Sequence, residues 1–275
     1  MGVSAPPDPR VAEPGLPGET TDATIPAVFG DLTASPAPRS GNSVAPAVVT
    51  EMFDEIAPVY DRLNTLMTLG ADGRWRRAAA DAARLLPGGA AIDVAAGTGK
   101  LAAALADRVG PFGRVLAVDI SARMIEHGNA ALPDIVQLEF RQGDALDLPA
   151  SDGEFDAATI AFGLRNLPDF EAGFNELRRV VRPGGRVVCL ELTTPRPRPW
   201  GRLFLGTFRR LAPLAGRVAG RSRRYGYLPA SLEGFPDAEA LADTMRRVGL
   251  LDIRVRRLGL GSVVLHVGVV PGSNR

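Results

Sequence analysis

The sequence predicts an α/β protein with a doubly wound, mostly parallel sheet of seven strands. Apolar runs of strand length alternate with amphipathic runs of helix length along most of its 275 residues. Such alternation is typical of a parallel sheet covered by helices on both faces. A glycine-rich turn follows the first strand. The last two apolar runs are joined by Gly259-Leu-Gly261, which predicts a closing antiparallel hairpin.

The elements can be placed by their periodicity. Large apolar residues recur at helical spacing over 49–67, where Pro58 is expected to kink the helix or divide it. Ser121 suits the N-cap of a later helix. The remaining helices are expected over 72–86, 100–109, 121–131, 169–181 and 236–248, and the strands over 90–94, 114–118, 136–141, 155–161, 186–192, 251–257 and 262–269.

Composition divides the chain into a tail, a domain and an insertion. Residues 1–46 contain nine of the 23 prolines and few large apolar residues, so they are predicted to be a disordered tail. Residues 47–271 are predicted to form one domain, with a helical cap insertion at about 195–232. Residues 192–232 contain nine arginines and no acidic residue, interleaved with Phe and Leu. This stretch suits either an anionic membrane surface or a solvated face.

The overall composition excludes several classes of protein. The net charge of +1 gives no field that favours nucleic acid, so no nucleic-acid partner is expected. The single cysteine, Cys189, lies in an apolar run and permits no disulfide framework, which suits a cytoplasmic protein. No apolar run approaches the roughly 20 residues of a membrane span. No metal site is predicted.

The segment 93–100, which reads DVAAGTGK, carries the main functional signal. A strand runs into Gly97 and Gly99, and a helix follows, so backbone N–H groups can approach a ligand closely. The next strand ends in Asp119, where a carboxylate can accept hydrogen bonds from ribose hydroxyls. These features predict a nucleotide-type cofactor site, and the glycines alone also fit a nicotinamide dehydrogenase.

Two further acids favour S-adenosylmethionine as the cofactor. Asp93, at the end of the first strand, suits an ammonium group and is an awkward neighbour for a pyrophosphate. Asp144, followed by Ala145, comes after the third strand, where a carboxylate can accept a bond from an adenine amino group. Acids at three successive strand ends therefore match the methionyl, ribose and base portions of this cofactor, and a nicotinamide cofactor remains the alternative.

Several longer segments make the chain resemble a known family. They are Met52–Asp61 with Asn64, Asp93–Gly99, Gly143–Pro149, Phe162–Asn166 (FGLRN), Glu191, Tyr225–Ser231, Phe235–Pro236 and His266–Gly268. Over about residues 48–270 the chain closely resembles the menaquinone/ubiquinone C-methyltransferases (UbiE/MenG type), which are class I S-adenosylmethionine-dependent methyltransferases with a Rossmann-like fold.

The resemblance implies methylation of a ring carbon of a prenylated demethylquinol, with demethylmenaquinol the favoured substrate. It implies cofactor contacts at Gly97, Thr98, Gly99, Asp119, Asp144 and Ala145, and at Ala161, where the family often has serine. Catalytic roles are expected for Arg165, Asn166 and Tyr60. Arginine stays protonated, so a water held by these residues is the better proton acceptor. A homodimer and peripheral contact with the inner face of the membrane are also expected.

Three points leave alternatives open. Lys100 stands where the family usually has Asp, and it is expected to pair with Asp93 or to contact the methionyl carboxylate. Lys100→Asp is therefore expected to keep or tighten cofactor binding, and deletion of 1–46 to leave activity intact. The alternative functions are methylation of the ubiquinone-pathway quinol or of another phenolic or polyketide metabolite, and a non-catalytic lipid- or quinone-binding module.

Overall fold

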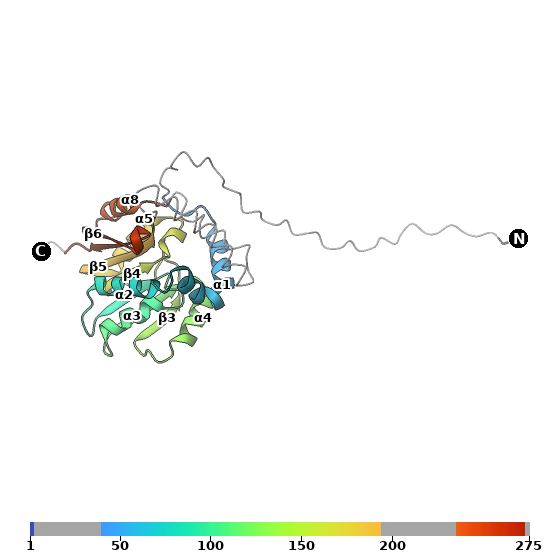
Figure 1. Ribbon diagram of the computed structural model, residues 1–275, viewed down its shortest axis with the longest axis horizontal. Coiled ribbons are helices and arrows are strands. Elements are labelled where there is room, and N and C mark those ends of the chain that lie inside the picture. Colours follow the sequence, from blue (N-terminus) through green and yellow to red (C-terminus); the bar gives the residue numbers. More distant parts are fainter. Residues whose placement is uncertain (3–39, 194–234, 273–275) are drawn as a thin grey trace. The chain divides into compact units, whose positions relative to one another are not determined.

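The computed structural model describes residues 1–2, 40–193 and 235–272. Most of the predicted tail (3–39) and the predicted cap insertion (195–232) lie outside the described residues. The predicted doubly wound sheet is confirmed, with its strands in the order β3-β2-β1-β4-β5-β7-β6 and only β7 antiparallel to its neighbours (Figure 1). The strands are β1 (Ala90–Val94), β2 (Arg114–Asp119), β3 (Leu138–Gln142), β4 (Phe155–Ala161), β5 (Val181–Leu192), β6 (Leu251–Leu258) and β7 (Val263–Val269).

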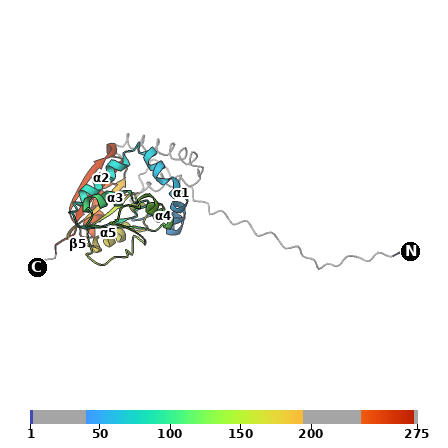
Figure 2. The same ribbon diagram turned by 90° about the horizontal axis from the view of Figure 1, so that it is seen from below.

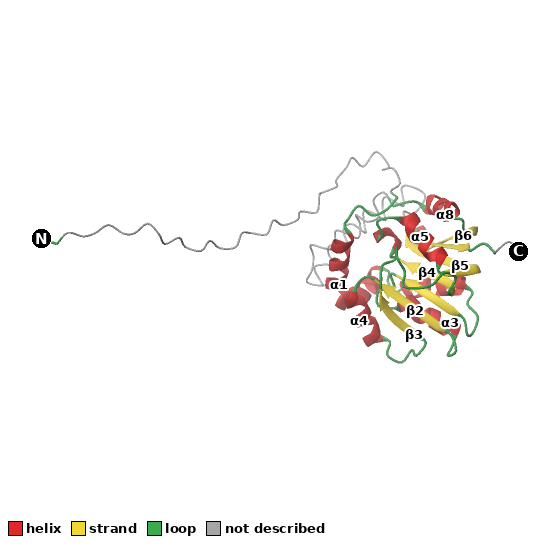
Figure 3. Cartoon of the chain, turned by 180° about the vertical axis from the view of Figure 1, so that it is seen from behind, coloured by secondary structure: helices red, strands yellow, loops and turns green. Residues whose placement is uncertain are grey.

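Helices cover both faces of this sheet. On one face α2 and α3 pack together over the sheet (Figure 2), and on the other α5 and α8 do so (Figure 3). A separate small cluster joins α1 to α4. The helices are α1 (Pro46–Met67), α2 (Asp72–Ala83), α3 (Lys100–Val109), α4 (Ala122–Ala131), α5 (Phe170–Arg179) and α8 (Ala238–Arg247), with short 3₁₀ turns η1 (Leu164–Asn166) and η3 (Gly259–Gly261).

The centre of the sheet sets the position of the ligand site. β1 lies between β2 and β4, and all three strands are parallel and almost wholly buried. Because α2 and α3 cover one face and α5 covers the other, both faces of these strands need apolar side chains, and the sequence supplies them as near-continuous runs. The chain leaves β1 toward β2 on one side, and β4 adds on the other side. In open α/β sheets such a reversal of strand order opens a crevice at the carboxyl ends of the strands.

Side-chain caps fix where several helices begin. Ser121, the predicted cap of α4, accepts a hydrogen bond from the backbone N–H of Met124 at 3.1 Å. Asp169 accepts two bonds from the first turn of α5. Each cap satisfies backbone donors that have no partner within the helix. The cap of α4 matters most for function, because Ser121 directly follows the loop after Asp119.

Three of the differences between the observed elements and the sequence expectations have a clear local cause. Pro58 lies inside one continuous α1 rather than dividing it. β5 begins at Val181, five residues early, because Val181 pairs with Phe155 before a shift in register. α2 ends at Ala83 rather than residue 86, because Arg84 adopts a left-handed conformation with φ of 51°.

Residues 40–46, here called the strap, belong to the folded part although the sequence assigned them to the tail. The N–H of Asn42 donates to the carbonyl of Leu167 at 2.7 Å, and the N–H of Phe170 donates to the carbonyl of Ser40 at 2.8 Å. Asn42 is buried. A Cβ atom on Gly41 would lie 1.7 Å from the carbonyl oxygen of Pro168, so only glycine permits this approach. The strap therefore packs against the segment that joins η1 to α5.

Candidate active site

The glycine loop has the backbone that the sequence predicts. Gly97 and Gly99 have φ of 58° and 79°, values that side chains disfavour. A Cβ on Gly99 would also lie 2.5 Å from Cζ of Phe140. With these turns the chain passes from β1 into α3 within five residues. The loop thus lies at the start of a helix, where backbone N–H groups point outward.

Asp119 joins this loop to the end of β2. Its two carboxylate oxygens accept hydrogen bonds from the N–H groups of Gly97 at 2.7 Å and Ser121 at 2.9 Å. Burial raises the pKa of Asp119, and these two hydrogen bonds oppose the shift. Each oxygen retains a second lone pair. The carboxylate is therefore held in place and can still accept bonds from a ligand.

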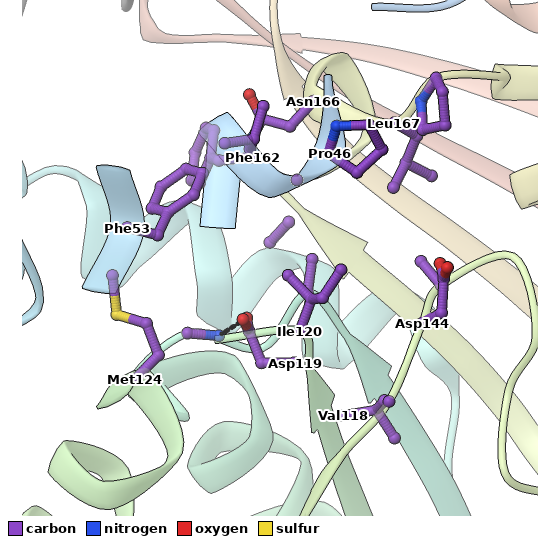
Figure 4. A pocket seen from close by; sticks show the side chains of 18 of the residues that line it. Pro46, Phe53, Val118, Asp119, Ile120, Met124, Asp144, Phe162, Asn166 and Leu167 are labelled. Atoms are coloured by element: carbon purple, nitrogen blue, oxygen red, sulfur yellow. Dashed lines mark hydrogen bonds between the residues drawn. The ribbon is translucent and has the colours of Figure 1, made fainter. Parts of the chain in front are cut away.

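A pocket that is open to solvent lies over these strand ends, and the empty space within it and at its mouth together is about 800 Å³. Figure 4 shows Asp119 and Asp144 on one side and Phe53, Phe162 and Asn166 on the other. A mostly apolar lining with few polar groups is typical of small-molecule sites. Of the predicted cofactor residues, Gly97, Asp119, Asp144, Ala145 and Ala161 line this pocket.

Thr98 points elsewhere, into a junction with α1 and α2. Its hydroxyl donates to Oδ1 of Asp61 on α1 at 2.8 Å. Nζ of Lys100 lies 3.4 Å from the same oxygen and 3.7 Å from Oδ2 of Asp72 on α2. The sequence suggested that Lys100 pairs with Asp93, and the structure shows that it does not. It pairs with carboxylates from two other helices.

The three predicted catalytic residues have different surroundings. Tyr60 on α1 and Asn166 in η1 line the pocket. Arg165 does not lie among the lining residues. Nη1 of Arg165 is 2.5 Å from Oε1 of Glu191, and both side chains are buried. The same Nη1 donates to the carbonyl of Phe162 at 2.6 Å. Arg165 therefore contacts the wall segment 162–166 and not the pocket itself.

Two ionisable side chains near the loop, Asp93 and Arg76, are buried, and only Asp93 was predicted from the sequence to contact a ligand. Asp93 is buried, and Oδ1 accepts a bond from the hydroxyl of Thr159 at 2.7 Å. Burial raises the pKa of Asp93 to about 7, although the bond from Thr159 and the charge of Arg76 oppose the rise. Arg76 on α2 is also buried, with its guanidinium 5.2 Å from the ring centroid of Phe162. No sequence motif marked Arg76. A charged residue on the buried face of a predicted helix is the signal that was available.

Three other titratable side chains, Cys189, His266 and Asp156, lie away from the pocket. Cys189 is buried in β5, and burial raises the pKa of its thiol. His266 is buried in β7, with Nε2 at 2.7 Å from the carbonyl oxygen of Ala238, and burial lowers its pKa. Asp156 lies at the start of β4, where it accepts a bond from the N–H of Ala90. None of the three lines the pocket.

Within residues 40–193 and 235–272, no group of three acidic, histidine or cysteine side chains suits a metal ion. Over the same residues, no helix combines the length and apolarity that crossing a membrane requires.

Known structures share this fold. A SAM-dependent methyltransferase from Aquifex aeolicus superposes with a TM-score of 0.51 at 17% identity, covering 68% of this chain and 84% of that one. The [4+2]-cyclase SpnF superposes with a TM-score of 0.57 at 20% identity, covering 86% of this chain and all of the other. Because these two proteins carry out different reactions, the fold alone does not decide the chemistry.

Sequence relatives are more specific. The chain is 39% identical to a demethylmenaquinone methyltransferase of Desulfitobacterium hafniense, over 82% of this chain and 90% of the relative. It is 42% identical to a protein of the same name from Thermus thermophilus, over 80% of this chain and all of the relative. A Geobacter sulfurreducens relative, 37% identical over 80% of this chain and 87% of its own length, is named ubiquinone/menaquinone biosynthesis C-methyltransferase UbiE.

The profile of the ubiE/COQ5 methyltransferase family matches residues 42–270. This range includes nearly all of the residues that the structure describes, and also the segment 194–234. Together with relatives of such identity and coverage, this match means that the chain belongs to the ubiE/COQ5 methyltransferase family.

Proposed function

We propose that the protein transfers a methyl group from S-adenosylmethionine to a ring carbon of demethylmenaquinol. The observation that carries this proposal is the position of Asp119, fixed at the end of β2 beside the glycine loop and facing the pocket. A carboxylate so placed suits a pair of ribose hydroxyls. Oδ2 of Asp93 is buried without a hydrogen-bond partner among the described residues, which suits a cationic ligand. Relatives named demethylmenaquinone methyltransferase support the substrate class.

When bound, S-adenosylmethionine supplies the methyl group, and the residues of the chain perform the remaining tasks. The strap and α1 contribute Pro46, Val49 and Phe53 to the pocket, and these apolar side chains exclude water from the reacting ring. A ring carbon that gains a methyl group must release its hydrogen as a proton. Asn166 and Tyr60 provide polar atoms at the pocket that can hold a water molecule to accept that proton.

Arg165 has a positioning role in this proposal. Its guanidinium is neutralised by Glu191, and it holds the carbonyl of Phe162, so it orients the wall that carries Phe162 and Asn166. Asn166→Ala and Tyr60→Phe are expected to lower kcat by about tenfold or more, because a misplaced proton acceptor weakens general-base catalysis.

The test is direct. Purified protein is incubated with isotopically labelled S-adenosylmethionine and a reduced demethylmenaquinone of short prenyl length, and mass spectrometry locates the methyl group. Label on the quinone ring supports the proposal, and failure to transfer it to any quinol contradicts it. A parallel reaction with the demethylated ubiquinone-pathway quinol compares the alternative substrate.

A peripheral membrane contact is part of the same proposal. A prenylated quinol resides in lipid, and the arginine-rich, apolar stretch 192–232 suits an anionic surface. Co-sedimentation with vesicles containing phosphatidylglycerol at low salt tests this contact. Equal recovery with neutral and anionic vesicles would contradict it.

A further inference from the structure

A second pocket lies against the half of α2 that is farther from the glycine loop. On this face of the sheet α2 packs over β5 and part of β7 (Figure 2), and Ala78 and Ala82 form the helix side of the pocket. Leu265 and Val267 of β7 form an apolar side. No described residue lines both this pocket and the one beside Asp119, so the two are separate places on the molecule.

The alternation of β6 brings two arginines to this pocket. Ile253 packs against the core cluster to which α8 contributes, and Arg257 pairs with Glu239 of α8 at 3.4 Å. Successive side chains of a strand point to opposite faces of the sheet. Arg254 and Arg256 therefore lie on the α2 face, where both line the pocket.

Two more arginines reach the same pocket from other elements. Arg84 directly follows α2, and Arg186 lies in β5, where its Nη1 donates to the carbonyl of Ala82 at 3.1 Å. Burial and the neighbouring charges of Arg84 and Arg254 lower the pKa of Arg186. Arginine nevertheless stays protonated in proteins. Four positive charges, from Arg84, Arg186, Arg254 and Arg256, therefore share one pocket.

The described residues place little negative charge beside these arginines. Asp81 is the one acidic residue among those that line the pocket, and Nη2 of Arg108 already lies 2.7 Å from its Oδ1. Arg84, Arg254 and Arg256 are exposed and form no ion pair with another described residue. Like charges held together raise the free energy of the folded chain, and an anion between them lowers it. The pocket therefore has the charge and the donors of an anion site.

We propose that this pocket is a second ligand site, which binds a phosphate-bearing anion. A planar guanidinium donates two parallel hydrogen bonds to phosphate oxygens, and this geometry favours arginine in phosphate recognition. The apolar side formed by Leu265 and Val267 suits a ligand that also has an apolar part. Such a phosphate comes either from the headgroup of an anionic lipid or from a soluble phosphate ester. The inference goes beyond the proposed methyl transfer and does not depend on it.

Calorimetric titration of the full chain in phosphate-free buffer tests the site with three probes. Inorganic diphosphate and glycerol 3-phosphate represent soluble ligands, and dihexanoylphosphatidylglycerol below its micelle concentration represents a lipid headgroup. We expect at least one of them to bind with a Kd below about 1 mM. Binding of a soluble probe assigns the site to soluble phosphates, and binding of the lipid alone assigns it to a headgroup. Dihexanoylphosphatidylcholine, which has the same acyl chains and no net charge, is the control for apolar contact.

Arg84→Gln and Arg254→Gln each remove one charge from the pocket. Each should weaken the bound probe about threefold, and the two together about tenfold, as for charge pairs that remain partly exposed. Arg77→Gln is the control for the first variant, because Arg77 is exposed on α2 outside the pocket. Arg257→Gln is the control for the second, because Arg257 lies on the opposite face of β6. Both controls should leave the Kd unchanged.

Thermal melting shows whether the variants remain folded. In phosphate-free buffer the double variant should melt no lower than the wild type, because the loss of two like charges relieves repulsion. The bound probe should raise the melting temperature of the wild type and leave that of the double variant unchanged.

Three outcomes would overturn the site. The first is that no probe binds the wild type. The second is an equal loss of affinity in the pocket variants and in their controls, because general attraction to a basic surface would then account for the binding. The third is binding of the two lipids with equal affinity and of neither soluble probe, because charge would then play no part. The proposed methyl transfer stands in all three cases, since the test uses neither S-adenosylmethionine nor a quinol.

Discussion

Arg165 and Glu191 form a buried ion pair directly behind the pocket wall, with 2.5 Å between Nη1 and Oε1. Glu191 also accepts bonds from the backbone N–H groups of Arg165 and Leu192. One carboxylate at the end of β5 thus holds both the side chain and the backbone of the turn that carries Asn166. The pair connects the stability of the fold to the geometry of the site.

Glu191→Gln should therefore lower the free energy of unfolding substantially. Removing one charge of a buried pair leaves the other uncompensated, and such changes typically lower the free energy of unfolding by about 3–5 kcal/mol. Asp243→Asn is the control, because it breaks an equally short but exposed pair with Arg246 and should cost less than about 1 kcal/mol. Urea denaturation measures both. Similar small losses in the two variants would contradict the structural role of Glu191.

Lys100→Asp should weaken ligand binding, the opposite of what the family pattern suggests. The new carboxylate would lie beside Asp61 and the buried Asp72. Two like charges 4 Å apart repel by on the order of 4 kcal/mol near a protein surface. A helix N-terminus favours an anion by only about 0.3–1 kcal/mol. The repulsion is larger, so α1, which carries Tyr60, should separate from the glycine loop.

Calorimetry with S-adenosylhomocysteine tests this expectation, and Lys100→Arg, which restores a cation, is the control. The arginine variant should bind like the wild type. If Lys100→Asp binds the ligand as tightly as the wild type does, Lys100 does not hold α1 in place.

Because the strap packs against the domain, we expect that the N-terminus can be shortened to residue 40, but not to residue 47, without loss of activity. A chain that begins at residue 40 keeps Asn42 and Pro46, whereas one that begins at residue 47 loses the contacts with Leu167 and Phe170 and the Pro46 wall of the pocket. We expect the first to retain methyltransferase activity and the second to lose most of it. Equal activity of the two would show that the strap is dispensable.

Gly41→Val tests the same contact without truncation. A Cβ there meets the backbone of Pro168 at distances that no rotamer relieves, so the strap must move away. The Michaelis constants should rise while the melting temperature changes little, because the strap lies outside the main core. Gly2→Val is a suitable control, since nothing lies near that residue.

Asp93 predicts a pH dependence of stability. Its pKa is about 7 in the folded protein, chiefly because of burial, against about 3.9 in an unfolded chain. Between these values the folded state retains a proton that the unfolded state has lost, so the free energy of unfolding should fall as pH rises from about 4 to 7. The full difference is on the order of 4 kcal/mol, at 1.36 kcal/mol for each pKa unit.

Asp93→Asn removes this dependence, and urea denaturation from pH 4 to 8 measures it. Thr159, Arg76 and Asp119 act on Asp93 from neighbouring elements, and all three remain in the variant. The difference between the two pH profiles therefore isolates Asp93. Parallel profiles would mean that Asp93 ionises in the fold as it does in water.

The sequence predicted the elements whose causes are local. β4 and α3 match their expected ranges, because Gly153 and Gly163 bound an apolar run and Gly99 precedes a helical one. Pro58 does not divide α1, because a helix packed against neighbours can tolerate a lost hydrogen bond. The strap was missed because its stability comes from backbone bonds to residues more than 120 positions away, such as that between Asn42 and Leu167.

The site was predictable where parallel strands end together. Asp119 and Asp144 face one pocket because β2 and β3 are neighbours in the sheet. The surroundings of Arg165, Thr98 and Arg76 were not predictable, since their partners lie on elements whose packing no periodicity specifies. A charge in a sequence motif indicates importance, but only the fold decides whether it faces a ligand or another side chain.

Lys100 is the only lysine in the chain, and it lies at the start of α3, a third exposed and fixed between two helices. A lysine-specific protease can therefore cut this protein at one position only, giving fragments 1–100 and 101–275. Cleavage of the native chain requires the glycine loop and the first turn of α3 to open locally. The rate of that single cut, with and without ligand, would report the opening of the site directly in the unmodified protein.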